Sequence, residues 1–174
     1  MKKALVVIDM QNDFIDGALG TPEAVLIVPR VFARVKAASL EAATQGTKLI
    51  FTQDTHSPDY LLTAEGKKLP VEHCVKPSKG WEIASVLLPY TKKAVVLEKP
   101  TFGATGLPAY VTDCDEITLV GLCTDICVIS NALLLKAFLP EATVRVEAAC
   151  CAGVTPESHR NALEAMKMCH IEII

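Results

Sequence analysis

Three side chains in this chain have the chemistry of an acyl-transfer centre: the thiol of Cys127, the carboxylate of Asp9 and the ammonium of Lys99. A thiol attacks a carbonyl carbon only after it gives up its proton, and a carboxylate at the end of an apolar strand is able to accept that proton. A nearby lysine stabilises both the thiolate and the carboxylate. Taken singly, Asp9 reads as a cap, Lys99 as a solvated charge and Cys127 as a small buried hydrophobe. Together they predict a Cys-Asp-Lys triad that acts on an amide.

A second group of polar side chains lies around a long loop and consists of Asp54, His56, Glu65 and His73. Imidazoles and carboxylates together suit zinc, iron(II) or manganese and leave coordination positions for water or substrate. A lone histidine is more often a surface or capping residue, but two of the four histidines fall in this one loop. We therefore predict one bound divalent metal ion, with zinc as the first choice and iron or manganese as alternatives.

The elements that must position these residues follow from the apolar pattern. Apolar runs predict strands at 4–8, 48–52, 94–97, 117–120, 143–146 and 171–174. Helices are predicted from Pro29 to residue 46, over 81–88 with Pro89 closing the helix, after Thr124, and over 156–168. Residues 57–80 form a long loop. The alternation predicts an α/β fold, doubly wound in three layers, with a mostly parallel six-stranded sheet and helices on both faces.

This topology brings the reactive side chains together. Ligands of doubly wound sheets bind beyond the carboxyl ends of the strands. The side chains that directly follow predicted strands are those of Asp9, Asp54, His56, Lys99 and Cys127. We therefore expect one site at one edge of one sheet.

Cys127 is expected in the first turn of a helix, because Gly121 ends the preceding strand and Thr124 and Asp125 are capping residues. Unpaired N–H groups and the positive end of the helix dipole collect at such a turn. A thiol there is biased toward the thiolate. An oxyanion formed beside it also meets backbone donors.

Composition bounds the class of protein. A length of 174 residues, about half of them apolar, predicts a single domain over 1–174. A net charge of −3 argues against nucleic acid and anionic membranes as partners. The odd number of cysteines, seven, argues against a disulfide framework. The apolar run after Lys3 is too short for a signal peptide and no run has the length of a membrane span, so we expect a cytoplasmic protein, with a homo-oligomer left open.

Two sequence motifs resemble those of the isochorismatase-like cysteine hydrolases. They are V-I-D-M-Q-N-D-F at 7–14 and G-L-C-T-D-I-C-V at 121–128, with Lys99 between them in the order of that family. The resemblance runs from about residue 5 to residue 153. It implies a doubly wound hydrolase domain.

The resemblance also implies roles for individual residues. Asp9 would be the base, Lys99 its partner and Cys127 the nucleophile. A cis peptide is implied between Leu122 and Cys123, with the backbone amides of Cys123 and Cys127 as oxyanion donors. None of these roles follows from spacing alone.

Within this superfamily, D-x-H at 54–56 followed by H-C-V at 73–75 resembles the metal site of nicotinamidases. The implied ligands are Asp54, His56 and His73, with Glu65 as a fourth ligand like that of some nicotinamidases. In those enzymes the metal binds the pyridine nitrogen, which orients the carboxamide over the cysteine. Phe14 and Phe102 match positions that flank the ring.

The resemblance and the residues together predict a nicotinamidase, which converts nicotinamide and water to nicotinate and ammonia through a cysteine thioester. One alternative is another small-amide cysteine amidohydrolase of the superfamily. A second is a catalytically silent protein that binds a small metabolite. Trp81 either closes the pocket or caps the core, and the sequence does not choose between these roles.

Overall fold

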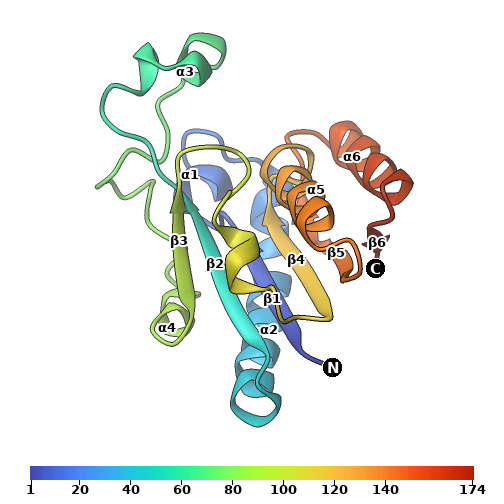
Figure 1. Ribbon diagram of the computed structural model, residues 1–174. Helices are drawn as coiled ribbons and strands as arrows, with labels where there is room; N and C mark the ends of the chain where they lie inside the picture. Colours follow the sequence, from blue (N-terminus) through green and yellow to red (C-terminus); the bar gives the residue numbers. More distant parts are fainter.

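A computed structural model describes residues 1–174, and its centre is a parallel six-stranded sheet (Figure 1). The strands are β1 (Lys3–Ile8), β2 (Lys48–Asp54), β3 (Val95–Lys99), β4 (Glu116–Leu122), β5 (Thr143–Ala152) and β6 (Glu172–Ile173). Their order is β3-β2-β1-β4-β5-β6, and every neighbouring pair is parallel. The winding direction changes between β1 and β4, which is where doubly wound sheets bind ligands. The predicted fold class is confirmed.

Helices cover both faces of this sheet, so that the molecule has three layers (Figure 1). Alternate residues of β1 point to opposite faces, with Leu5 and Val7 in one hydrophobic core and Val6 and Ile8 in the other. The first core is closed by α1 (Asn12–Ile15) and α2 (Pro22–Gln45), and α4 (Leu88–Thr91) lies near α2. The second core is closed by η2 (Leu107–Tyr110), α5 (Ile129–Phe138) and α6 (Pro156–Met168). None of the helices has both the length and the apolar character needed to cross a membrane.

The start of α2 differs from its prediction. The helix begins at Pro22, and the hydroxyl of Thr21 caps it by accepting a hydrogen bond from the Ala24 amide at 3.0 Å. Pro29 therefore lies inside the helix rather than at its first turn. Its side chain is exposed, so the carbonyl that loses its helical partner faces water.

The predicted helix over 81–88 is wrong. The helix in this region, α4, begins at Leu88, and Pro89 lies in its first turn instead of closing it. The preceding segment pairs with the segment after β1, where Ile83 bridges to Gln11, and it then turns at residues 85–87. The Asn12 amide donates to Glu82 O at 3.0 Å, and the Ala84 amide donates to Met10 O at 2.9 Å. Such long-range pairing leaves no trace in local helical periodicity.

Strand β4 continues through Gly121 to Leu122, two residues beyond the predicted end. Gly121 has φ +117°, and a Cβ at this position would lie 2.1 Å from the carbonyl oxygen of Ile8. Only glycine allows β4 to remain this close to β1. The chain then enters η3 (Thr124–Val128), a π-helical turn that leads into α5, so Cys127 lies in a wider turn than predicted.

The long connection between β2 and β3 forms an arm that projects from the carboxyl edge of the sheet (Figure 1). It contains η1 (Tyr60–Leu62) and α3 (Ala64–Lys68), where a loop was predicted over 57–80. The hydroxyl of Thr63 caps α3 by accepting a hydrogen bond from the Gly66 amide at 3.0 Å. A Cβ on Gly66 would lie 2.1 Å from the carbonyl oxygen of Tyr60, so a glycine is required for α3 to pack on η1.

Candidate active site

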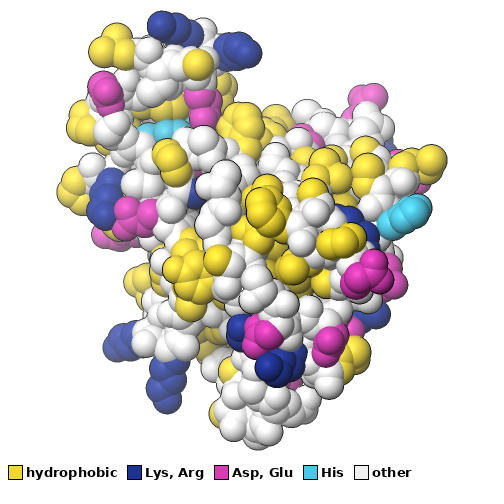
Figure 2. Space-filling model, viewed as in Figure 1, with side chains coloured by type: hydrophobic (Ala, Val, Ile, Leu, Met, Phe, Trp, Pro, Cys, Tyr) yellow, Lys and Arg dark blue, Asp and Glu magenta, His cyan; other side chains and the backbone are white.

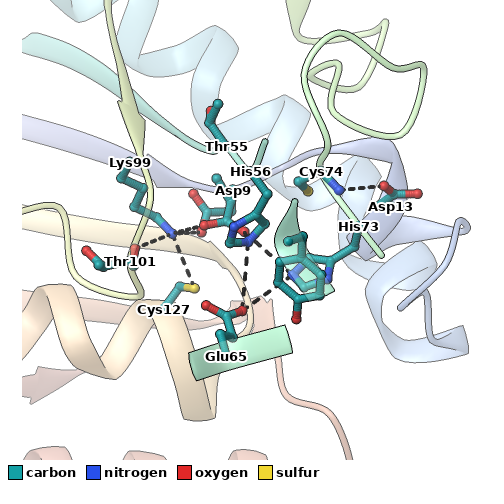
Figure 3. Close-up of polar contacts among 12 residues, drawn as sticks. Asp9, Asp13, Thr55, His56, Glu65, His73, Cys74, Lys99, Thr101 and Cys127 are labelled. Carbon is teal, nitrogen blue, oxygen red and sulfur yellow. Dashed lines mark hydrogen bonds and ion pairs between the residues drawn. The ribbon is translucent and has the colours of Figure 1, made fainter. Parts of the chain in front are cut away.

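The structure brings Asp9, Lys99 and Cys127 into contact beyond the ends of β1, β3 and β4 (Figure 3). The Nζ atom of Lys99 lies 2.7 Å from Oδ2 of Asp9 and 3.5 Å from Sγ of Cys127. The hydroxyl of Thr52 donates to Oδ1 of Asp9 at 2.7 Å and accepts from the Asp9 amide at 3.2 Å. These contacts place a thiol, a carboxylate and an ammonium in one buried cluster.

Burial controls the charge states of this cluster, because Asp9 is 0 %, Lys99 2 % and Cys127 4 % exposed. Burial raises the pKa of Asp9, and Lys99 offsets only part of that rise. Burial works to lower the pKa of Lys99, but the carboxylates of Asp9 and Asp54 and the Cys127 sulfur outweigh it and raise that pKa, so Lys99 is a fixed cation.

The thiol of Cys127 behaves differently from the sequence-based expectation. Burial, reinforced by the neighbouring Asp9, raises the pKa of Cys127 well above its ordinary value, and Lys99 opposes this shift only in part. The predicted bias toward a free thiolate is therefore wrong for the resting protein.

The pairing of β2 with β3 places this cluster beside a second one, which contains Asp54, His56 and His73. Asp54 and Lys99 are direct partners in the pairing of β2 with β3, and Oδ1 of Asp54 accepts a hydrogen bond from Lys99 Nζ at 3.0 Å. The other oxygen, Oδ2, lies 2.9 Å from Nε2 of His56 and 3.7 Å from Nε2 of His73. Burial tends to raise the pKa of Asp54, but His56 and Lys99 outweigh it and lower that pKa, so Asp54 is an anion.

The donor atoms of the second cluster fit a divalent metal ion. One ligand atom each from Asp54, His56 and His73 lies within 4.8 Å of the others. Oε1 of Glu65 is 3.8 Å from Nε2 of His56 and 3.7 Å from Nε2 of His73, on the same side of the cluster (Figure 3). Nδ1 of His73 bonds to the carbonyl of Val71 at 2.8 Å, which leaves Nε2 free as a ligand. The buried Nε2 of His56 lies 2.9 Å from Oδ2 of Asp54 but outside hydrogen-bond geometry, so it is available as a ligand atom. Two carboxylates and two imidazoles with free Nε2 atoms are ligands that zinc accepts.

Residues that sequence reasoning did not select hold this cluster in place. The ring of Tyr60 packs on both imidazoles, with centroids 4.7 Å from His56 and 4.9 Å from His73. Gln11 accepts a hydrogen bond from the Asp54 amide at 2.7 Å and donates to the Asp54 carbonyl at 2.8 Å. Tyr60 acts by packing and Gln11 by binding the Asp54 backbone, so neither residue type by itself indicates a role in the site. The one clue in the sequence was the position of Gln11, two residues after Asp9.

Asp13 and Asn131 have similar supporting roles. Oδ2 of Asp13 accepts a hydrogen bond from the Cys74 amide at 2.7 Å, next to His73, where Cys74 has φ +47°. Asn131, fully buried in α5, donates to the carbonyls of Cys127 at 2.8 Å and Phe102 at 3.1 Å. Its Oδ1 accepts from the Ala104 amide at 2.8 Å. Asn131 thereby ties the loop after β3 to the turn that carries Cys127.

A cavity of about 360 Å³ joins both clusters to solvent. Its lining consists of Phe14, Leu19, Asp54, Ala64, Glu65, Lys68, Leu69, His73, Thr101, Phe102, Cys123, Ile126 and Cys127. Both aromatic residues predicted beside a substrate ring thus line the cavity. Phe14 is buried and packs on His73 at a centroid distance of 5.5 Å, whereas Phe102 is 46 % exposed.

Trp81 is not among the lining residues. Its indole N–H donates to the hydroxyl of Thr55 at 2.9 Å, and the ammonium of Lys76 lies 5.1 Å from its ring centroid. Its backbone carbonyl accepts hydrogen bonds from Gln11 and Gln53. Trp81 thus supports the strand ends without contacting the cavity.

The backbone beside Cys127 also has the expected form. The peptide between Leu122 and Cys123 is cis. The carbonyl of Cys123 accepts hydrogen bonds from the amides of Ile126 at 3.1 Å and Val128 at 3.0 Å, while the amide of Cys123 has no acceptor within the chain. Burial raises the pKa of Cys123 to about 12, so its side chain is a neutral thiol.

Comparison with known proteins supports one family. A model of the isochorismatase domain matches residues 3–174. The chain belongs to the isochorismatase family. This family assignment agrees with the resemblance of the two motifs.

Solved structures of isochorismatase-family hydrolases share the fold over nearly the whole chain. The nicotinamidase/pyrazinamidase PncA of Bacillus subtilis is 27 % identical, covers 99 % of both chains and has a TM-score of 0.82. The pyrazinamidase of Pyrococcus horikoshii in complex with zinc is 25 % identical, covers 99 % of this chain and 98 % of its own, and has a TM-score of 0.81. The N-carbamoylsarcosine amidase of Thermoplasma acidophilum is 26 % identical, covers 99 % of this chain and 95 % of its own, and has a TM-score of 0.79. These three proteins are named as amidases, and this chain, an isochorismatase-family hydrolase, shares their fold over nearly its whole length.

Proposed function

We propose that this protein is a nicotinamidase, which hydrolyses nicotinamide to nicotinate and ammonia. The observation that carries the proposal is the position of Lys99, whose Nζ contacts both Asp9 and Asp54 and lies 3.5 Å from Cys127. That arrangement puts a nucleophile and a metal-ligand cluster on one cavity. A substrate with an amide and a ring nitrogen fits both at once. The similarity to nicotinamidase and pyrazinamidase structures supports the same choice.

The first half of the reaction is the attack of Cys127 on the carboxamide carbon. Asp9 accepts the thiol proton as the S–C bond forms, and the carbonyl oxygen takes the negative charge. The backbone amides of Cys123 and Cys127 then donate to this oxyanion, an interaction worth roughly 3 kcal/mol per donor. Lys99 keeps the Asp9 carboxylate ionised until the proton moves.

The second half releases both products. Asp9 returns its proton to the nitrogen of the amide as the C–N bond breaks, which liberates ammonia and leaves a thioester on Cys127. Asp9 next takes a proton from water as the water oxygen attacks the thioester carbon. When the S–C bond breaks, the sulfur recovers that proton from Asp9, and the product departs as nicotinic acid, which ionises to nicotinate by losing its proton to water.

Substrate orientation depends on the second cluster and on the aromatic walls. Asp54, His56 and His73, with Glu65, would hold one divalent metal ion, and this ion would supply a Lewis-acid contact for the ring nitrogen. Phe14 and Phe102 would flank the ring, with the buried Phe14 fixing its plane.

The decisive experiment is ammonia release from nicotinamide by purified protein, before and after chelation and with zinc, iron(II) or manganese added back. We expect release that falls on chelation and returns with metal. Cys127→Ala should abolish release, whereas Cys169→Ala, which changes an exposed cysteine in the turn after α6, should not. No release from the metal-loaded protein would refute nicotinamide as the substrate.

A second candidate is a cysteine amidohydrolase for a different small amide. The observation that favours it is the exposure of Phe102, which lines the cavity but is 46 % exposed, so that the cavity is open to solvent on this side. The similarity to N-carbamoylsarcosine amidase agrees with this breadth. Hydrolysis of other small amides that continues after chelation would favour this candidate over the first.

A further inference from the structure

Outside the two clusters, most of the cavity lining is apolar. Phe14, Leu19, Ala64, Leu69, Phe102 and Ile126 supply most of its surface. Lys68 is the only lysine or arginine among the lining residues. In an apolar pocket, a small number of polar groups fix the orientation of the ligand. A single lysine in such a lining therefore favours a substrate that has an anionic group at that point.

Helix α3 presents Lys68 to the cavity by its geometry. Four lining residues come from α3 and the residue that follows it: Ala64, Glu65, Lys68 and Leu69. They lie on one face of the helix, because positions four residues apart point in the same direction. Both lysines are exposed, but Lys67, on the other side of the helix, does not line the cavity. Figure 2 shows basic side chains at the outer end of the arm that carries α3.

No carboxylate of the chain neutralises Lys68. Glu65 lies three residues earlier, at a spacing at which ion pairs form on helices. Its carboxylate is instead directed at Nε2 of His56 and of His73, at 3.8 and 3.7 Å. The charge of Lys68 is thus free to act on a ligand.

The helix is also fixed relative to the cavity. Gly66 lies against the carbonyl of Tyr60 so closely that a Cβ would be 2.1 Å from its oxygen. The phenol of Tyr60 donates to the carbonyl of Leu69 at 2.9 Å, next to Lys68. Tyr60 itself is fully buried. The backbone that carries Lys68 is therefore positioned by the same residue that packs on the two imidazoles.

We propose that Lys68 forms a subsite for an anionic group and that the protein prefers small amides which carry a carboxylate away from the scissile amide. This inference rests on the proposed amidase function and narrows its substrate class. Such a substrate places its amide at Cys127 and its carboxylate at the mouth of the cavity, where Lys68 meets it through a charge-assisted hydrogen bond.

The test compares two ring amides of equal shape. One is 5-carbamoylpyridine-3-carboxylate, and the other is 5-acetylpyridine-3-carboxamide, which is neutral. For a partly solvated ion pair we expect kcat/KM to favour the acid by about fivefold, with the difference in KM. Lys68→Met should bring this ratio to about one, and Lys68→Glu should bring it below one. Lys67→Met, the matched control on the same helix, should keep the wild-type ratio. Added salt should reduce the ratio for the wild type but not for Lys68→Met.

Binding without turnover separates this proposal from the proposed function. Calorimetry on zinc-loaded Cys127→Ala protein should show tighter binding of the acid than of the ketone, and a second change, Lys68→Met, should remove the difference. That result together with no hydrolysis of either amide would support the subsite while refuting the reaction. Equal acid-to-ketone ratios in the wild type, Lys68→Met and Lys68→Glu would overturn the subsite.

Discussion

Lys99 ties the charge state of Asp9, the proposed base, to that of Asp54, a proposed metal ligand. Its ammonium contacts Asp9 at 2.7 Å and Asp54 at 3.0 Å, and all three side chains are buried. Two carboxylates this close would repel each other without a cation between them. Lys99 therefore does more than support the nucleophile: it allows both anions to exist in one desolvated pocket.

The pH dependence of kcat/KM should report the ionisation of Asp9. The base works only when deprotonated, and burial raises its pKa, so activity should be lost at a higher pH than for an ordinary carboxylate as pH falls. The Thr52 hydroxyl lowers the pKa of Asp9 by donating to Oδ1 at 2.7 Å. Thr52→Val should therefore raise that pKa and move the acid limb of the kcat/KM profile to higher pH.

The control for this change is Thr118→Val, which removes another buried threonine hydroxyl, from the interior of β4. Its profile should match that of the wild type. An unshifted acid limb in Thr52→Val would show that Asp9 is not the group that titrates.

Elements that depend on local pattern were predictable from the sequence, and elements that depend on distant partners were not. The apolar run before Asp9 identified β1, and the helix predicted over 156–168 has those bounds in α6, where the structure adds Thr155 as its cap. The segment after Trp81 was mispredicted because its backbone bonds to residues around Asn12, some seventy positions earlier in the chain. At the site, reactive side chains were identifiable by type, whereas Tyr60 was not, since its contribution is the packing of its ring.

Helix α3 should lose its position if Gly66 gains a side chain. In Gly66→Ala the new Cβ would meet the Tyr60 carbonyl at 2.1 Å, so α3 must move and take Glu65 with it. We expect zinc affinity to fall by about tenfold or more, as for other changes that displace a metal ligand. Competition with a chromogenic chelator measures this affinity.

Gly106→Ala is the matched control, because a Cβ there meets nothing within 4 Å. Its zinc affinity should equal that of the wild type. Unchanged affinity in Gly66→Ala would mean that neither Glu65 nor the packing of α3 contributes to metal binding.

The loop after β3 should become less ordered when the hydrogen bonds of Asn131 are removed. Asn131→Ala leaves the buried Ala104 amide and the carbonyl of Cys127 without side-chain partners. The free energy of unfolding should fall by roughly 2–4 kcal/mol, and KM should rise because Phe102 loses its anchor. Urea denaturation and steady-state kinetics measure the two effects. Asn161→Ala, at an exposed position of α6, should change stability by no more than about 0.5 kcal/mol.

At the scale of the whole molecule, the metal cluster links the arm to the sheet. Asp54 belongs to β2, whereas His56, Glu65 and His73 belong to the connection that follows. A ligand that binds only the folded state stabilises it in proportion to its affinity and concentration. Metal binding should therefore be visible in the stability of the entire fold.

Zinc at about one hundred times its Kd should add about 2.7 kcal/mol to the free energy of unfolding, which corresponds to roughly 5–10 °C in Tm for a chain of this size. Scanning calorimetry of the chelated and zinc-loaded protein measures the shift. His73→Asn should remove most of it. His170→Asn, at an exposed position with φ +61° that asparagine tolerates, should retain it. Equal shifts in both variants would contradict the assignment of His73.

The residues of the two clusters are distributed differently along the sequence, and this difference affects how substrate specificity can change. The triad is drawn from three separate strand ends, so it changes only if the sheet changes. The metal ligands and Lys68 all lie in the single stretch 54–73, most of it outside the sheet. Recombination that exchanges this one stretch would alter what the enzyme recognises while the bond-breaking machinery is inherited intact. If Lys68 forms the proposed anionic subsite, grafting residues 54–73 onto another member of the family should transfer a preference for anionic amides.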